Sequence, residues 1–258
     1  MGNTPHSGAG RRQVIAAPRS SVLRAALAAL VLAPALAVAG PADKVYTPQV
    51  EQGETEFEFR SGFQSGPSEH AFIADIGYGF TPWWFSEVVG EFEGAPGENT
   101  RYAALEWENI FLLTEPGKYW ADVGIFFEYA HTRDSDEPDE IEIGPMFQKE
   151  FGDLQVNLNP LFERTVGRND SGKTELAYRA QMKWRGNERF EPGLQAIGSA
   201  GFFGEIGREK EHKLGPAFFG TMRLDNRNKI KYDAALLFGL NHDAPDTTLR
   251  LTFEYEMY

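Results

Sequence analysis

Residues 248–257 read TLRLTFEYEM, a run in which apolar and polar side chains alternate at every position. The apolar set is Leu249, Leu251, Phe253, Tyr255 and Met257, and threonine, arginine and glutamate lie between its members. Successive side chains of a β-strand point to opposite faces of the sheet. The run therefore predicts a strand with one apolar face and one charged face.

The same alternation recurs about twelve times between Thr55 and Met257, in segments of roughly ten residues, the length of a membrane-crossing strand. Short turns rich in Gly, Pro, Asn or Asp separate the segments. An even number of such strands predicts an all-β fold, a transmembrane antiparallel β-barrel of about 12 strands over residues 54–258. A soluble periplasmic barrel with its apolar face inward has the same periodicity, but large side chains such as Trp107 and Phe253 would overfill a small closed core.

Residues 1–39 have the pattern of a signal peptide. Four arginines and no acidic residue precede an apolar run at 25–36, and Ala-Val-Ala at 37–39 is a small-x-small cleavage signature. Residues 40–53 are polar and contain two prolines, and they are predicted to form a periplasmic N-terminal segment. An exported barrel of this kind is expected in the cell outer membrane of a Gram-negative bacterium.

The charge balance and the absence of cysteine exclude several functions. The chain has 38 acidic and 25 basic residues, a net charge of −13, and loss of the arginine-rich leader makes it more negative. Nucleic acid is therefore not expected as a partner, because it requires a basic surface. Without cysteine the chain has neither disulfides nor thiolate metal ligands, and no cofactor is expected. Outer-membrane lipid and small solutes are the expected partners.

Five stretches in the last third of the chain carry a family resemblance: FEPG at 190–193, LGPAFFG at 214–220, KIKYDA at 229–234, LLFGL at 236–240 and PDTTLRL at 245–251. Together they resemble proteobacterial outer-membrane β-barrels of the porin-like group, some of which are labelled as channels linked to phenol degradation. The resemblance implies the barrel fold, the outer membrane and a channel role.

The last strand also resembles the signal that the outer-membrane assembly machinery reads, which makes that machinery an expected partner. Tyr258 supplies a terminal aromatic residue, although it is out of phase by one position with the apolar stripe that ends at Met257.

The polar face of the strands predicts the lining of the lumen. The strands in the first half of the chain contribute mostly acidic residues to this face, and those in the second half contribute most of the basic residues. The predicted pore-lining residues are Glu58, Glu106, Glu128, Glu142, Arg179, Lys183, Arg223, Lys231 and Arg250. The bases are expected to face the acids across the pore, which leaves a net acidic wall and a mild preference for cations.

The predicted charged lining of the lumen favours a porin-like channel for the passive passage of small hydrophilic or amphipathic solutes. One alternative is a structural barrel whose lumen is filled with ion pairs, since a twelve-stranded barrel is narrow. Another is a lipid-modifying enzyme, which needs a serine activated by histidine. None of the four histidines after residue 39 lies two positions before a serine, so no catalytic residue is predicted. No metal ligand is predicted either, because the acidic stretch at 134–140 lacks the glycine and spacing of a calcium loop.

Overall fold

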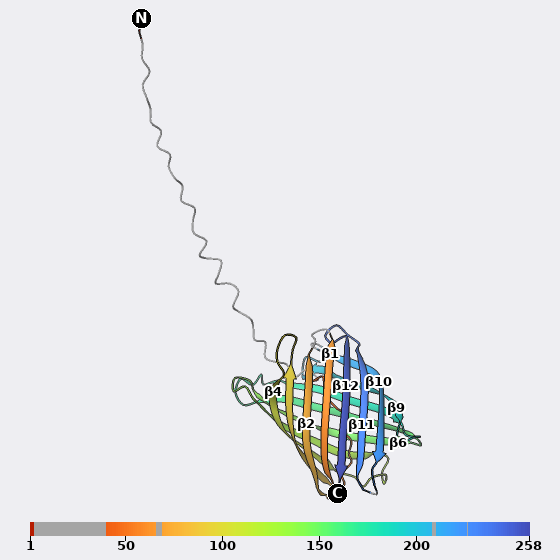
Figure 1. The fold of residues 1–258 in the computed structure, drawn as a ribbon. Helices are drawn as coiled ribbons and strands as arrows, with labels where there is room; N and C mark the ends of the chain where they lie inside the picture. Colours follow the sequence, from red (N-terminus) through yellow and green to blue (C-terminus); the bar gives the residue numbers. More distant parts are fainter. Residues whose placement is uncertain (3–39, 66–68, 208–209, 226) are drawn as a thin grey trace. The chain divides into compact units, whose positions relative to one another are not determined.

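A computed structural model describes residues 1–2, 40–65, 69–207, 210–225 and 227–258. The predicted signal peptide therefore lies almost entirely outside the described residues. The predicted fold is confirmed: the described residues form twelve strands in one closed antiparallel barrel (Figure 1). The strands are β1 (Thr55–Ser65), β2 (His70–Thr81), β3 (Trp84–Gly94), β4 (Arg101–Leu112), β5 (Asp122–Thr132), β6 (Asp139–Phe151), β7 (Leu154–Val166), β8 (Thr174–Trp184), β9 (Glu191–Phe202), β10 (His212–Arg223), β11 (Lys229–Gly239) and β12 (Thr247–Met257).

Each strand pairs with its neighbours in sequence, and β1 closes the ring against β12. Thr55 lies opposite Met257, so the first strand begins where the last one ends. We call this end of the barrel the terminal end, and the opposite end, which carries the β1–β2 connection, the loop end (Figure 1). Closure pairs every strand on both sides and leaves no sheet edge exposed.

The predicted faces of the strands are also confirmed. Phe253 and Trp107 are 51% and 50% exposed, whereas Arg250 and Glu108 on the opposite face are each 1% exposed. Large exposed apolar side chains occur on strands all around the barrel. This inversion, apolar outside and charged inside, suits a barrel whose outer surface contacts lipid. No helix in the described part of the chain is long and apolar enough to span a membrane.

Proline occurs inside several strands, at points where the ladder of backbone hydrogen bonds is interrupted. The β6–β7 register passes from the pair Ile143–Phe162 to the pair Phe147–Leu158, and Pro145 and Pro160 lie in the gap between. Proline has no N–H to donate to a ladder, so it is tolerated where pairing is absent. Because both prolines lie in the same gap, the missing β6–β7 backbone hydrogen bonds are confined to one place in the barrel wall.

Candidate functional site in the barrel lumen

Residues 40–53, which we call the lumen segment, lie inside the barrel. Tyr46 is 4% exposed; its backbone N–H donates to Asn159 Oδ1 at 2.9 Å, and Asn159 Nδ2 donates to the Tyr46 carbonyl oxygen at 3.1 Å. Asn159 lies on the inward face of β7. The sequence predicts a periplasmic location for this segment, but the structure places it against the inner wall. The polar inner face provides partners for its backbone, which an apolar interior could not.

The lumen segment runs along the barrel from the loop end to the terminal end. Near the loop end, a Cβ atom on Gly62 would lie 2.0 Å from the carbonyl oxygen of Pro41. Near the terminal end, a Cβ atom on Gly79 would lie 2.0 Å from the carbonyl oxygen of Glu51. Only glycine allows such a close backbone approach. The wall is therefore shaped to receive the segment at both of its ends.

An apolar layer surrounds Tyr46 at mid-length of the segment. The Tyr46 ring stacks on Phe126, with ring centroids 3.8 Å apart and planes inclined by 22°. Buried inward-facing side chains complete the layer: Phe85, Ile110, Met146, Leu161 and Ala177. Side chains thus fill the lumen at this level in the way that they fill small barrels.

A row of glutamates follows the inner wall from strand to strand. Each member lies directly opposite the next in the strand register, over six consecutive strands. We call this the acidic row: Glu87, Glu108, Glu128, Glu142, Glu163 and Glu175. Like charges directly opposite on neighbouring strands destabilise a sheet, so the row requires cations nearby.

Two bases, Lys44 and Arg60, compensate the charge of the first two members of the acidic row, Glu87 and Glu108. Lys44 of the lumen segment lies 2.9 Å from Glu58 and 3.5 Å from Glu87. Arg60 of β1, itself 2% exposed, lies 2.9 Å from Glu58 and 3.5 Å from Glu108. The lumen segment therefore contributes charge as well as bulk to the closed barrel.

Arg179 of β8 compensates the charge of two later members of the acidic row, Glu142 and Glu163. Its guanidinium donates to both oxygens of Glu142, at 2.7 and 2.8 Å, and lies 3.7 Å from Glu163. It also lies 3.4 Å from Asp43 of the lumen segment. A two-point arginine–carboxylate contact is among the strongest charged hydrogen bonds in proteins. Arg179 thus joins two members of the row to the segment.

Two further predicted pore-lining bases, Arg250 and Lys231, pair with acids on adjacent strands. Arg250 contacts Asp233 of β11 and donates to the carbonyl oxygen of Asp43 at 3.0 Å. Lys231 lies 2.8 Å from Glu254 of β12. These pairs are formed along the wall, whereas the sequence pattern predicts bases that face the acids across the pore.

Two predicted pore-lining bases lie near the terminal end. Lys183 lies 3.1 Å from Glu191 of β9. Arg223 occupies the last position of β10, where its side chain is 63% exposed and 3.1 Å from Glu188 of the β8–β9 turn. Alternation placed Arg223 on the inward face, but at the end of a strand that face opens to solvent. Arg223 therefore belongs to the rim.

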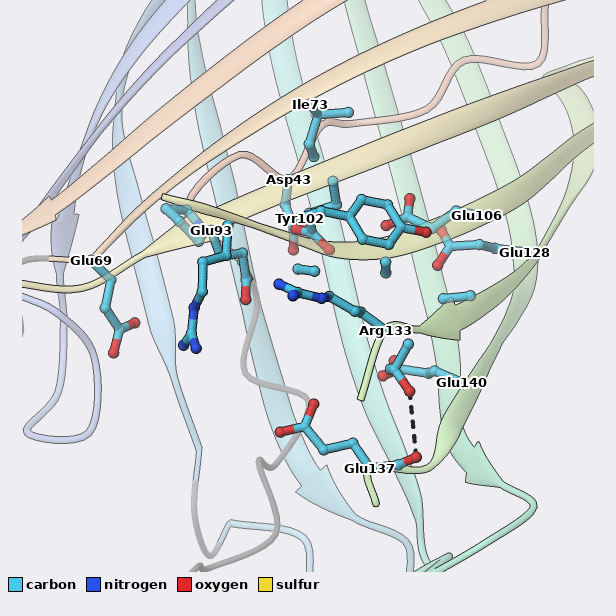
Figure 2. Close-up of a pocket in the computed structure, with 18 of the residues that line it drawn as sticks. Asp43, Glu69, Ile73, Glu93, Tyr102, Glu106, Glu128, Arg133, Glu137 and Glu140 are labelled. Carbon is cyan, nitrogen blue, oxygen red and sulfur yellow. Dashed lines mark hydrogen bonds between the residues drawn. The ribbon is translucent and has the colours of Figure 1, made fainter. Parts of the chain in front are cut away.

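A cavity of about 830 Å³ lies above the apolar layer, and residues of the loops line its mouth. We call it the vestibule. Figure 2 shows the acidic side chains Glu69, Glu93, Glu137 and Glu140 around it. Its lining also includes Asp43, Glu91, Glu98, Glu106, Glu108, Glu128, Glu142 and Glu163, with Arg60, Arg101, Arg133 and Arg179 as the bases. An excess of acids in a confined space raises the local concentration of cations.

Glu106 and Glu128 differ from the other predicted pore-lining residues. Among the residues that the structure describes, neither has a basic ion-pair partner. Figure 2 shows their carboxylates next to each other on the vestibule wall. The sequence identified both as inward-facing, but their proximity depends on the β4–β5 register.

At the terminal end of the barrel, the segment contacts the C-terminal residue, Tyr258. The Tyr258 hydroxyl donates to the Glu51 carboxylate, and Lys229 Nζ lies 3.7 Å from Glu51. The hydrogen bond from Tyr258, followed by the positive charge of Lys229, lowers the pKa of Glu51 below its ordinary value of 4.5. This contact fixes the point where the lumen segment leaves the barrel.

The closed twelve-stranded barrel, with its lipid-suited exterior and charged interior, is the architecture of an outer-membrane β-barrel. The NanC porin has the same fold, with a TM-score of 0.55 and 9% identity over 78% of this chain and 99% of that one. The KdgM porin, solved in complex with disordered oligogalacturonate, gives a TM-score of 0.50 and 11% identity over 79% and 98% of the two chains. No protein-family model matches the sequence, and no curated protein matches it either.

Proposed function

We propose that this protein is an outer-membrane channel for small hydrophilic solutes, with a mild preference for cations, and that the lumen segment closes it. The vestibule is the observation that carries the proposal. A solute-sized cavity opens to the loop end and stops at a layer centred on Tyr46, a residue of the segment. Movement of this one peptide would therefore change the lumen more than any single wall side chain could.

The way in which the segment is held supports this proposal. Hydrogen bonds and ion pairs made by Asp43, Lys44 and Tyr46 attach it to the wall, and all of them are reversible. Gly62 and Gly79 give it a fitted path. The fold that it shares with the NanC and KdgM porins is one in which a lumen can conduct. The link to phenol degradation stays a prediction from the sequence.

The charge of the vestibule supports the preference for cations. Acids outnumber bases on its lining, and two of the predicted pore-lining acids, Glu106 and Glu128, lie on its wall without an ion-pair partner among the described residues. Charges around a narrow low-dielectric passage act with less screening than charges on a free surface. The preference is therefore expected to weaken in high salt, as the Debye length shortens.

A structural barrel with a permanently closed lumen is the second candidate. The apolar layer and the buried ion pairs of Arg60, Arg179 and Arg250 favour it, because they fill the lumen as a core does. A lipid-modifying enzyme has less support. His70, His131 and His212 hydrogen-bond to threonine, aspartate and tyrosine, respectively, and not to serine.

Conductance across planar bilayers tests the proposal. The chain without its leader is compared with the double variant Gly62→Ala, Gly79→Ala, in which two new Cβ atoms collide with the backbone of the lumen segment. The matched control is Gly90→Ala, because a Cβ atom at Gly90 meets nothing closer than 3.7 Å. A second variant lacks residues 41–49, which removes the segment from the vestibule and the apolar layer.

We expect rare openings of the parent chain and of Gly90→Ala, and larger or more frequent openings of the double variant and the deletion. Folding is checked by the electrophoretic shift on heating that compact barrels show. If the folded deletion variant gives a flat current trace, the wall itself closes the lumen. The protein is then a structural barrel with a permanently closed lumen, and the proposed channel function is wrong.

A further inference from the structure

The acidic row has a gap in its charge compensation at Glu128. Lys44 lies close to Glu87, Arg60 to Glu108, and Arg179 to Glu142 and Glu163. In the row, Glu128 lies between Glu108, which contacts Arg60, and Glu142, which contacts Arg179. It has neither a hydrogen bond nor an ion pair with any residue in the described part of the chain. Its neighbours in the register, Glu108 and Glu142, are both acids.

Three carboxylates converge at this gap. Glu106 and Glu108 lie two positions apart on β4, and Glu128 faces them from β5. One oxygen atom from each lies within 4.8 Å of the others. Figure 2 shows Glu106 and Glu128 with their carboxylates adjacent. This spacing allows the three oxygens to contact a single ion.

A second observation points to a missing ligand. Glu108 is 1% exposed and lines the vestibule, yet its Oε2 atom has no hydrogen-bond partner. Within the described residues its one ion pair is the 3.5 Å contact of Oε1 with Arg60. A buried carboxylate oxygen without a partner is costly, so such atoms call for an explanation. A cation between Glu108 and Glu128 would supply the partner.

The other three acidic clusters in the described lumen also contain buried carboxylate oxygens without a hydrogen-bond partner, but they differ in their basic neighbours. Each of the three contains a carboxylate that lies within ion-pair distance of a lysine. Lys229 contacts Glu256, Lys231 contacts Glu254 and Glu256, and Lys44 contacts Glu58 and Glu87. These ammonium groups compensate part of the negative charge of the three clusters. The cluster at Glu128 has no lysine in ion-pair contact.

We propose that Glu106, Glu108 and Glu128 bind a calcium ion at the wall of the vestibule. Carboxylate oxygens are hard ligands, and calcium accepts six to eight of them, including water, in flexible geometry. Magnesium demands a near-ideal octahedron and gives up water reluctantly, which three side chains on a rigid wall serve less well. The vestibule gives the ion access from the loop end and leaves room for its waters. This site does not require the channel to open.

Isothermal titration of the folded protein in detergent with calcium chloride tests the site. We expect saturable binding to one site by the parent chain, weaker binding of magnesium, and a loss of roughly tenfold or more in calcium affinity for Glu106→Gln and Glu128→Gln, because affinity follows the ligand charge. Both variants remove one of several crowded like charges, so both should fold. The control is Glu98→Gln, since Glu98 also lines the vestibule but pairs with Arg101 at 3.2 Å.

The same variants separate the proposal from its alternatives. Equal calcium affinity in the parent chain, Glu106→Gln and Glu128→Gln would overturn it, as would no binding by the parent chain at millimolar calcium. A loss of binding in Glu98→Gln alone would place the ion at the loops and also overturn it. Thermal unfolding provides an independent readout: calcium should raise the unfolding temperature of the parent chain but not that of Glu128→Gln. Because binding is measured without current, the result is independent of whether the barrel conducts.

Discussion

Replacement of Arg179 by glutamine should destabilise the barrel more than any change at an exposed ion pair. Arg179 is 6% exposed and makes the two-point contact with Glu142, and it is the charged partner of Glu163 and Asp43. The variant leaves three neighbouring carboxylates without this base. Glutamine retains hydrogen-bonding capacity, so the change tests the charge.

The magnitude follows from the contact geometry. Two unit charges about 4 Å apart interact by about 4 kcal/mol at an effective dielectric constant near 20. Breaking a buried pair by removing one partner costs about 3–5 kcal/mol. We therefore expect the free energy of unfolding to fall by about 4 kcal/mol, close to a thousandfold in the unfolding equilibrium.

Urea titration of the protein folded in lipid vesicles, followed by tryptophan fluorescence, measures this change. The matched control is Arg101→Gln, because Arg101 pairs with Glu98 at 3.2 Å while both side chains are more than half exposed. An exposed pair contributes about 0–1 kcal/mol. If Arg179→Gln costs no more than Arg101→Gln, the buried network does not stabilise the barrel, and the reasoning from burial fails.

Further predictions concern pH and ion selectivity. Because the folded-state pKa of Glu51 lies below 4.5, its hydrogen bond stabilises the fold above that pH and is lost as the pH falls through the lowered value. Tyr258→Phe should therefore lower the urea midpoint at neutral pH but not at a pH well below 4.5; equal losses at both would contradict the assignment. In chains that lack residues 41–49, Glu106→Gln and Glu128→Gln should shift the reversal potential in a salt gradient towards anions. Arg223→Gln, at the exposed rim, should leave that potential unchanged, and a shift as large as that of Glu128→Gln would show that the rim selects ions.

Several parts of the candidate site follow from the sequence. Alternation on β8 and β12 predicts Arg179 and Arg250 on the polar face, where the structure buries both, because the direction of a side chain on a strand is a local property. The same rule could not identify their partners. Arg250 meets Asp233 and Arg179 meets Glu142 only because of the strand register. For Arg223 the rule gives the face of the strand but not how close the residue lies to the end of the barrel. It therefore could not predict that Arg223 lies at the exposed rim.

The sequence by itself determined the strands, their number, the lipid-suited outer face and the acidic character of the inner one. All of these follow from a period of two and from composition, which the chain carries locally. Only the tertiary structure decided that residues 40–53 lie inside the barrel and that six glutamates align in one row. Closure fixes the register and with it every cross-strand neighbour, and the fit of a polar peptide depends on partners from strands distant in the sequence. The positions of Tyr46 and Glu128 are consequences of the closed ring.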